Sequence, residues 1–221
     1  MLLVYRWVQT LARALAPAFG GGRSKVARGL AGRRDAHEVL ARWGSTERDP
    51  GRPVVWVHAP SVGEGHVAGA VIERLRLALP DLQVVYTFFS PSAEGPVRHM
   101  DTDVAAYLPW DLKRPMSLVL DTVRPDLLVF TRTEVWPVLV AQARARRIPV
   151  AIVGGVVPDD ARRMRPLARH VLRATWQSVA FAGAVTARDR ERFVDLGVPE
   201  DHAFTTGDPA VDSALIRFDQ T

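Results

Sequence analysis

From residue 53 onward, the chain alternates short, continuous apolar runs with stretches of helical periodicity. The runs are not interrupted by a polar residue at every second position, which is typical of strands buried on both faces. Such strands belong to parallel sheets that helices cover on both sides. The expected strands are VVWVHA, QVVYTFF, VAAYLP, DLLVFT, PVAIVGG, SVAFAGAVT and HAFTTG. The expected helices are GHVAGAVIERLRLAL, a short polar helix after the second strand, KRPMSLVLDTV, EVWPVLVAQARARR and DDARRMRPLARHVLRA.

The composition supports a packed core and limits the chemistry. Hydrophobic residues make up 48% of the 221 residues, and cysteine is absent. The lack of cysteine excludes disulfides, thiolate metal ligands and cysteine nucleophiles. Any catalytic group in this chain must therefore be an oxygen or nitrogen side chain.

Positive charge is concentrated in residues 1–48, which hold nine Arg or Lys against three Asp or Glu. The opening MLLVYRWVQTLARALAPAF mixes apolar residues with arginines and falls short of the ~20 apolar residues of a transmembrane helix. It predicts an interfacial helix, and the basic residues after it suit anionic lipid headgroups. These residues are Arg23, Lys25, Arg28, Arg33 and Arg34. The alternative is an amphipathic helix packed on the domain.

Turn residues cluster at 44–51 and mark the one expected boundary. We therefore expect a basic amphipathic membrane-associating arm over residues 1–48 and an α/β domain over residues 49–221. In parallel sheets, ligands bind outside the carboxyl ends of the strands, so the loops that follow the expected strands should form the site.

Two glutamates follow expected strands at the same spacing from a hydroxyl residue: Ser61 precedes Glu64, and Thr131 precedes Glu134. Each pair matches the S/T-x-x-E capping box, in which the two side chains bond the first amides of a helix. Each carboxylate could instead take a proton from a substrate. The residues alone leave both interpretations open.

Other polar residues near these loops also have two interpretations. Gly63 permits close approach of a ligand to the backbone, whereas His58 at a strand end is more often a hydrogen-bonded core group. Ser90 and Ser92 could bind sugar oxygens or cap a helix. Asp111 is expected to cap the helix near KRPMSLVL.

Five motifs in order, HAPSVGE, FFSPSAE, YLPWD, RTEVWP and TGDPAVD, carry a family resemblance. The stretch from about Val54 to Asp212 resembles the 3-deoxy-D-manno-octulosonic acid (Kdo) transferases, whose motifs have the form HAxSVGE, TxTPSG, YLPxD, ETExWP and TGNxxxD. Arg132 stands where the family pattern has the first glutamate of ETExWP, and Ala93 stands where TxTPSG has its glycine.

The resemblance implies a GT-B glycosyltransferase with two Rossmann-like halves, of which this chain is the first, acceptor-binding half. It implies transfer of Kdo from CMP-Kdo to a lipid A precursor, with inversion and without a metal or other cofactor. CMP-Kdo would bind through a C-terminal domain that this chain lacks. The implied location is the cytoplasmic face of the inner membrane, and the chain alone is expected to be inactive. The alternative is a non-catalytic membrane-docking or interaction module that retains the fold.

The same resemblance assigns roles to individual residues. Glu64 matches the glutamate proposed as catalytic base, and Glu134 matches a glutamate that could orient the acceptor or assist proton transfer. The expected substrate-binding residues are Ser61, Gly63, Ser90, Ser92 and Arg132. Arg132 could bind a phosphate or carboxylate, or pair with Glu134.

Several ligand classes have no support in the sequence. Gly154, Gly155 and Gly207 are weak candidates for a phosphate loop, because neither GxGxxG nor a Walker pattern surrounds them. The histidines and carboxylates show no metal-ligand spacing. The arginine-rich stretch at 162–173 is expected to be a solvated helix face, with contact to anionic lipid as the second interpretation. Because the excess charge is confined to the arm, nucleic acid is not an expected partner.

Overall fold

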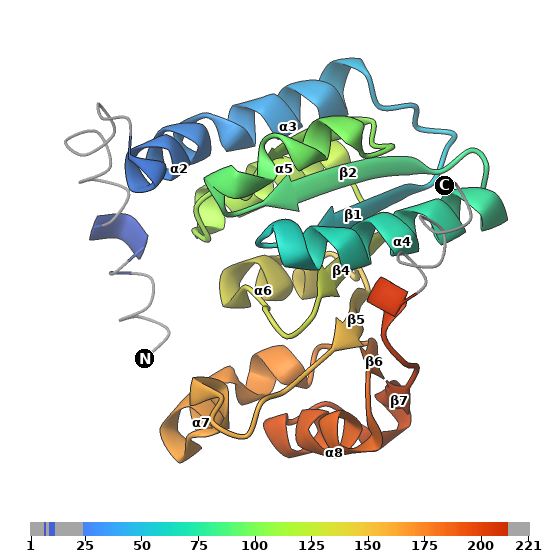
Figure 1. The fold of residues 1–221 in the computed structure, drawn as a ribbon. Coiled ribbons are helices and arrows are strands. Elements are labelled where there is room, and N and C mark those ends of the chain that lie inside the picture. Colours follow the sequence, from blue (N-terminus) through green and yellow to red (C-terminus); the bar gives the residue numbers. More distant parts are fainter. Residues whose placement is uncertain (1–6, 8, 12–23, 212–221) are drawn as a thin grey trace.

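The parallel sheet predicted from the apolar runs is present in the computed structural model, which describes residues 7, 9–11 and 24–211. Its seven strands have the order β3-β2-β1-β4-β5-β6-β7, and every neighbouring pair is parallel (Figure 1). The strands are β1 (Val54–His58), β2 (Gln83–Phe88), β3 (Val104–Tyr107), β4 (Leu127–Thr131), β5 (Val150–Gly155), β6 (Phe181–Ala184) and β7 (Ala203–Thr205). The chain therefore starts in the middle of the sheet, extends to one edge and then crosses to the other.

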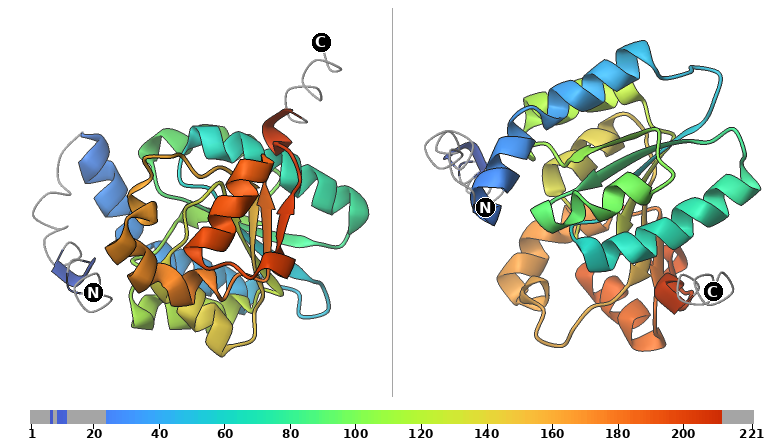
Figure 2. Two further views of the ribbon diagram at one scale, coloured as in Figure 1. Left: turned by 90° about the horizontal axis from the view of Figure 1, so that it is seen from below. Right: turned by 45° about the horizontal axis from the view of Figure 1, so that its top comes forward.

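Helices cover both faces of the sheet, as Figure 2 shows from two further directions. The α-helices are α2 (Lys25–Arg34), α3 (Ala36–Thr46), α4 (Val62–Ala78), α5 (Lys113–Val123), α6 (Pro137–Ala145), α7 (Pro166–Trp176) and α8 (Ala187–Leu196). One core cluster joins the sheet to α3, α5, α6, α7 and α8, and a second joins it to α4 and the start of α3. The α/β fold with helices on both faces is thus confirmed.

Three helix predictions need correction. The helix expected from Glu134 begins at Pro137, because Thr131 still belongs to β4 and the loop at 132–136 intervenes. The helix expected over 159–174 is a 3₁₀ turn, η3 (Arg162–Met164), followed by α7, since the residue before Pro166 is extended. The short polar helix after β2 consists of two 3₁₀ turns, η1 (Pro91–Ala93) and η2 (Pro96–His99). Helix α8 was not predicted.

The described part of the N-terminal segment packs on the sheet domain. Leu40 and Trp43 of α3 are buried in the larger core cluster, and a Cβ on Gly44 would lie 2.6 Å from the Thr122 backbone of α5. The predicted interfacial helix lies outside the described residues except for 7 and 9–11. Within the described residues, none of the helices combines the length and apolar content that crossing a bilayer requires.

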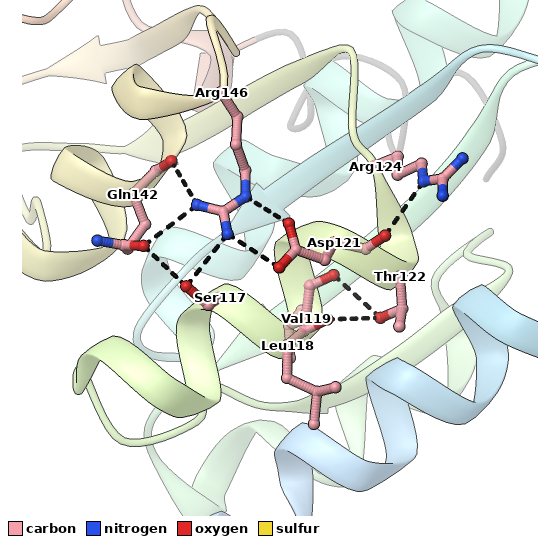
Figure 3. Close-up of polar contacts among 8 residues, drawn as sticks. All are labelled: Ser117, Leu118, Val119, Asp121, Thr122, Arg124, Gln142 and Arg146. Carbon is pink, nitrogen blue, oxygen red and sulfur yellow. Dashed lines mark hydrogen bonds and ion pairs between the residues drawn. The ribbon is translucent and has the colours of Figure 1, made fainter.

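An arginine at the end of α6 ties this helix to α5 (Figure 3). The Arg146 guanidinium donates to both carboxylate oxygens of Asp121, at 2.7 and 3.0 Å, and to the Ser117 hydroxyl at 3.1 Å. The hydrogen bonds from Arg146 lower the pKa of Asp121. Because α6 starts at the loop that carries Glu134, its fixed position also fixes one end of that loop.

Candidate functional site

A cavity of about 1050 Å³ opens at the carboxyl edge of the sheet. The start of α4, the loop after β4, the segment after β5 and one side of α7 form its walls; in Figure 1 these elements gather where the strand arrows point. Its polar lining includes Glu64, Arg132, Glu134 and Arg163. The expectation that the two glutamates converge is therefore met by the geometry.

Glu64 lies in the first turn of α4 and lines the cavity. Ser61 is the N-cap residue, but its side chain accepts no hydrogen bond from the helix; its hydroxyl donates to the Glu64 carboxylate instead. The capping-box interpretation is therefore wrong here, because the Ser61 side chain accepts no hydrogen bond from a helix amide. Gly63 is exposed, and a Cβ added there would have the Ser61 Oγ, at 3.9 Å, as its nearest neighbour, so internal packing does not demand a glycine.

Glu134 lies in the loop between β4 and α6 and lines the same cavity. No helix starts at Thr131, whose hydroxyl donates to the His58 carbonyl at 3.3 Å, so the second capping box is also wrong. Burial raises the pKa of Glu134; the Arg163 charge lowers it, the Glu64 charge raises it and the Arg33 charge lowers it. Two carboxylates with different surroundings thus face one cavity.

Arg132 has a left-handed backbone with φ of 61° and pairs with Asp208 rather than with Glu134. Its guanidinium donates to an Asp208 carboxylate oxygen at 3.1 and 3.2 Å and to the Gly154 carbonyl at 3.1 Å. Asp208 occupies the position of the asparagine in TGNxxxD. Two departures from the family pattern, Arg132 and Asp208, are therefore in direct contact.

Two of the three glycines considered as a phosphate loop, Gly154 and Gly155, serve packing, whereas a Cβ on Gly207 would meet nothing within 4 Å. A Cβ on Gly155 would lie 2.4 Å from the Phe193 ring of α8, and one on Gly154 would lie 3.1 Å from both Pro209 and Val67. Both positions therefore bring elements together instead of leaving the backbone open to a ligand.

Arg163 was missed as a site residue, because the sequence places it in an arginine-rich stretch that resembles a solvated face. It is only partly exposed and lines the cavity. Burial lowers the pKa of its guanidinium, and the nearby Glu134 charge opposes that effect. Its place after β5 was the signal, since the loop at that strand end was expected to reach the site.

The structure does not bring Ser90 and Ser92 to this cavity, whose described lining excludes both. Ser90 is the N-cap of η1; its hydroxyl accepts from the Ser92 amide at 3.4 Å and lies 2.8 Å from the Ser92 hydroxyl. The structure therefore shows Ser90 as a helix cap, which was one of the two interpretations of these serines.

His58 is a buried, hydrogen-bonded group next to the site. Its Nδ1 lies 3.0 Å from the Thr87 carbonyl, and Trp136 donates its indole N–H to Nε2 at 3.1 Å. Nε2 must accept, so Nδ1 carries the proton and the ring is neutral. Burial lowers the pKa of His58 to about 3.

Asp111 is also buried, and it caps a helix as predicted, but not the helix that was expected. Its carboxylate accepts from the amides of Val138 at 3.0 Å and Leu139 at 2.8 Å, so it caps α6 instead of the helix that follows it in sequence. Only the folded chain brings this carboxylate to the start of α6.

Arg33 was expected at a lipid surface but is buried, with 5% of its surface exposed. Its Nε donates to the Leu108 carbonyl at 3.1 Å. Its guanidinium lies over the rings of Phe89, Trp110 and Trp136. It is therefore unavailable to a headgroup.

Among the described residues, no group of three or more His, Asp or Glu side chains is arranged to hold a metal ion.

A family model described as 3-deoxy-D-manno-octulosonic-acid transferase (kdotransferase) matches residues 37–213. The chain is 30% identical over 221 residues to such a transferase from Bordetella pertussis, covering 95% of this chain and 50% of the relative. It is 29% identical over 156 residues to that of Haemophilus influenzae, covering 69% of this chain and 36% of the relative. The chain thus spans about a third to a half of these relatives.

Among solved structures, the UDP-GlcNAc 2-epimerase of Neisseria meningitidis matches with a TM-score of 0.57 at 14% identity. The match covers 76% of this chain and 50% of the epimerase chain. At this identity, the likeness supports the Rossmann-like fold and nothing further.

Proposed function

The chain belongs to the 3-deoxy-D-manno-octulosonic acid transferase family, and from that premise we propose that it is the acceptor-binding half of a glycosyltransferase. The proposed reaction moves Kdo from CMP-Kdo to a lipid A precursor. The observation that carries the proposal is the pair Glu64 and Glu134, which face one cavity at the carboxyl edge of the sheet. Because the chain spans about half of its relatives or less, the donor is assigned to a second half by the family resemblance.

Glu64 is the proposed base. An acceptor hydroxyl is a weak nucleophile until a positioned group removes its proton in the transition state. As the acceptor oxygen bonds to the anomeric carbon of Kdo, Glu64 takes the hydroxyl proton and the bond from that carbon to the CMP phosphate breaks. CMP leaves with the bonding electrons, and attack from the opposite face inverts the anomeric centre. The proton transfer uses a carboxylate alone, in keeping with a metal-independent reaction.

Glu134 is proposed to orient the acceptor. Burial raises the pKa of its carboxyl, whereas the Arg163 charge lowers it. An ionised carboxyl group can accept a hydrogen bond from a sugar hydroxyl, and a protonated one can donate a hydrogen bond to it. Glu134 can therefore fix the hydroxyl that Glu64 deprotonates.

The cavity walls suit an amphiphilic acceptor. Leu172 of α7 contributes apolar surface, while Arg163 contributes positive charge and Arg132 an ion pair with Asp208. Gly63 leaves the first turn of α4 open, and Ser61 holds the Glu64 carboxylate. Ser90 and Ser92 are proposed as contacts for a more distant part of the acceptor, since they lie outside the cavity lining.

We also propose that the protein docks on an anionic membrane surface, at the cytoplasmic face of the inner membrane. Leu167 of α7 is 63% exposed, and Arg165, His170 and Arg173 are exposed around it. This surface adjoins the cavity wall formed by α7 and supplements the basic arm proposed for residues 1–48. Nucleic acid is not proposed as a partner.

The test is transfer of labelled Kdo from CMP-Kdo to a lipid A precursor by the protein that carries this chain. Glu64→Gln should reduce turnover about 10²- to 10⁴-fold, which is the usual contribution of a general base. The same variant of this chain should still bind vesicles that contain the lipid A precursor.

A control separates acceptor recognition from general attraction to negative charge. Vesicles of equal negative charge, made from ordinary anionic phospholipid, should bind more weakly and should lose binding as salt is raised. Near-normal turnover in Glu64→Gln would remove Glu64 as the base. Equal, salt-sensitive binding to both vesicle types would favour the non-catalytic docking module instead.

A further inference from the structure

Arg33 makes contacts that no role in lipid binding explains. It belongs to the last turn of α2, yet its guanidinium carbon lies 4.2 Å from the centre of the Phe89 ring, 4.7 Å from that of Trp110 and 5.5 Å from that of Trp136. These rings come from the segments that follow β2, β3 and β4. One buried cation thus joins three loops at the carboxyl edge of the sheet.

Trp136 is the ring in this group that reaches the cavity loop. It stacks on Phe89 with ring centres 5.5 Å apart, and its indole N–H donates to His58 at 3.1 Å. Because the His58 Nδ1 proton is directed to the Thr87 carbonyl, Nε2 can only accept and the indole has one fixed orientation. Trp136 is therefore held by Arg33, Phe89 and His58 together, two residues after Glu134.

We propose that Arg33 is a positioning residue, which clamps Trp136 so that the loop after β4 presents Glu134 to the cavity opposite Glu64. The proposal deepens the function assigned above and rests on it for its biological meaning. A guanidinium can serve here where an ammonium cannot, because it is planar, stacks on aromatic faces and still donates to a carbonyl.

The clamp also brings a positive charge near Glu134. Other charged groups face this carboxyl from the surrounding elements: Arg163 from η3, Glu64 from α4, and Arg132 and Asp160 in the cavity lining. Arg33 acts on Glu134 in the direction that keeps the carboxyl ionised. Removing the Arg33 charge should therefore raise the pKa of Glu134. If Arg33 only filled space, its replacement by an uncharged side chain of similar size would leave that pKa unchanged.

The experiment uses this chain without donor or acceptor. The Glu134 carboxyl is followed by carbon NMR through a pH titration, with its signal assigned by its loss in Glu134→Gln. Exchange of the Trp136 indole N–H with solvent reports on the clamp. The variants are Arg33→Met, which removes the charge, and Arg33→Lys, which keeps the charge but not the planar stack. Arg34→Met is the matched control, because it removes the neighbouring charge from an exposed position of the same helix.

Arg33→Met should raise the Glu134 titration midpoint and speed the Trp136 indole exchange by about tenfold, as expected for the loss of a desolvated cation–π contact. Arg33→Lys should speed the exchange while leaving the midpoint close to that of the wild type. Arg34→Met should change neither.

The proposal is overturned if Arg33→Met leaves both readouts unchanged, or if Arg34→Met changes them equally. Should Arg33→Met fail to fold, unchanged indole exchange in Arg33→Lys would overturn it. Because neither readout requires Kdo transfer, the clamp can fail while the transferase function stands, and the reverse also holds.

Discussion

Helices α4 and α8 begin with the same spacing, a hydroxyl residue three positions before a carboxylate, but the two carboxylates have different surroundings. At α8, Thr186 accepts from the Asp189 amide at 3.1 Å, and the Asp189 carboxylate accepts from the amides of Thr186 at 3.2 Å and Val157 at 2.8 Å. In both helices the hydroxyl also donates to the carboxylate. At α4, however, Ser61 accepts no hydrogen bond from a helix amide, and Glu64 lines the cavity.

The difference separates a structural carboxylate from one available for chemistry. The oxygens of Asp189 are occupied by backbone amides and the Thr186 hydroxyl, and its surface is 6% exposed, whereas Glu64 lines the cavity. The same contrast distinguishes His58 and Asp111, whose ring and carboxylate are used within the protein, from Glu134. Replacing the groups that are bonded within the protein should therefore lower stability, whereas replacing Glu64 should lower turnover and leave stability nearly unchanged.

The largest expected effect concerns His58. Its pKa falls from 6.5 in the unfolded chain to about 3 in the folded protein, so protonation favours the unfolded state. The stability that the neutral ring contributes is complete above pH 6.5 and is lost as the pH falls toward 3. The His58 contribution to the free energy of unfolding should drop by about 1.4 kcal/mol per pH unit in this window, or about 5 kcal/mol in all.

Urea unfolding at a series of pH values measures this loss in the wild type and in His58→Gln, whose amide can also donate and accept. The variant should lose the part of the pH dependence that His58 contributes. His99→Gln, at an exposed position, should keep it. Equal slopes in wild type and His58→Gln would show that His58 is not protonated on unfolding.

The next effect contrasts the two carboxylates directly. Asp189→Asn should lower the free energy of unfolding by about 2–3 kcal/mol, because an amide nitrogen replaces an acceptor beside buried backbone N–H groups. Glu64→Gln should change it by less than about 0.5 kcal/mol, as is usual away from buried networks. Denaturant midpoints of both variants test the contrast, and similar losses would mean that Glu64 is a structural group as well.

The smallest effect concerns the hydroxyls. Thr186→Ala removes a cap that bonds the helix and should cost about 1 kcal/mol, whereas Ser61→Ala removes no bond to a helix amide and should cost less. Thermal unfolding of the two alanine variants measures both. An equal or larger loss for Ser61→Ala would indicate that Ser61 does cap α4 in solution.

Local sequence patterns predicted most of the framework. Continuous apolar runs located all seven strands, because strands buried on both faces need apolar residues at consecutive positions. The same patterns placed Glu64 and Glu134 after strands β1 and β4, and therefore at one edge of the sheet. Helix α8 was missed because its polar sequence, ARDRERFVDL, shows only a narrow apolar face.

Contacts between distant segments were not predictable in the same way. The S/T-x-x-E spacing could not show that Thr131 would remain in a strand or that Ser61 would bond a side chain. Asp111 caps a helix that starts 26 residues later. Arg33, in the segment expected to form a basic arm, packs against three aromatic rings. Except for Ser61, whose partner Glu64 is three residues away, these partners lie far away in sequence, so the spacing of neighbouring residues carries no information about them.

The sequence by itself thus determined the parallel sheet, the family and the edge at which two glutamates meet, since each depends on local pattern and strand direction. Only the tertiary structure decided which polar groups are used internally and which face the cavity. The physical reason is that burial and hydrogen-bond partners, which set the pKa of His58 and Glu134 and the pairing of Arg132 with Asp208, are properties of segments brought together by folding.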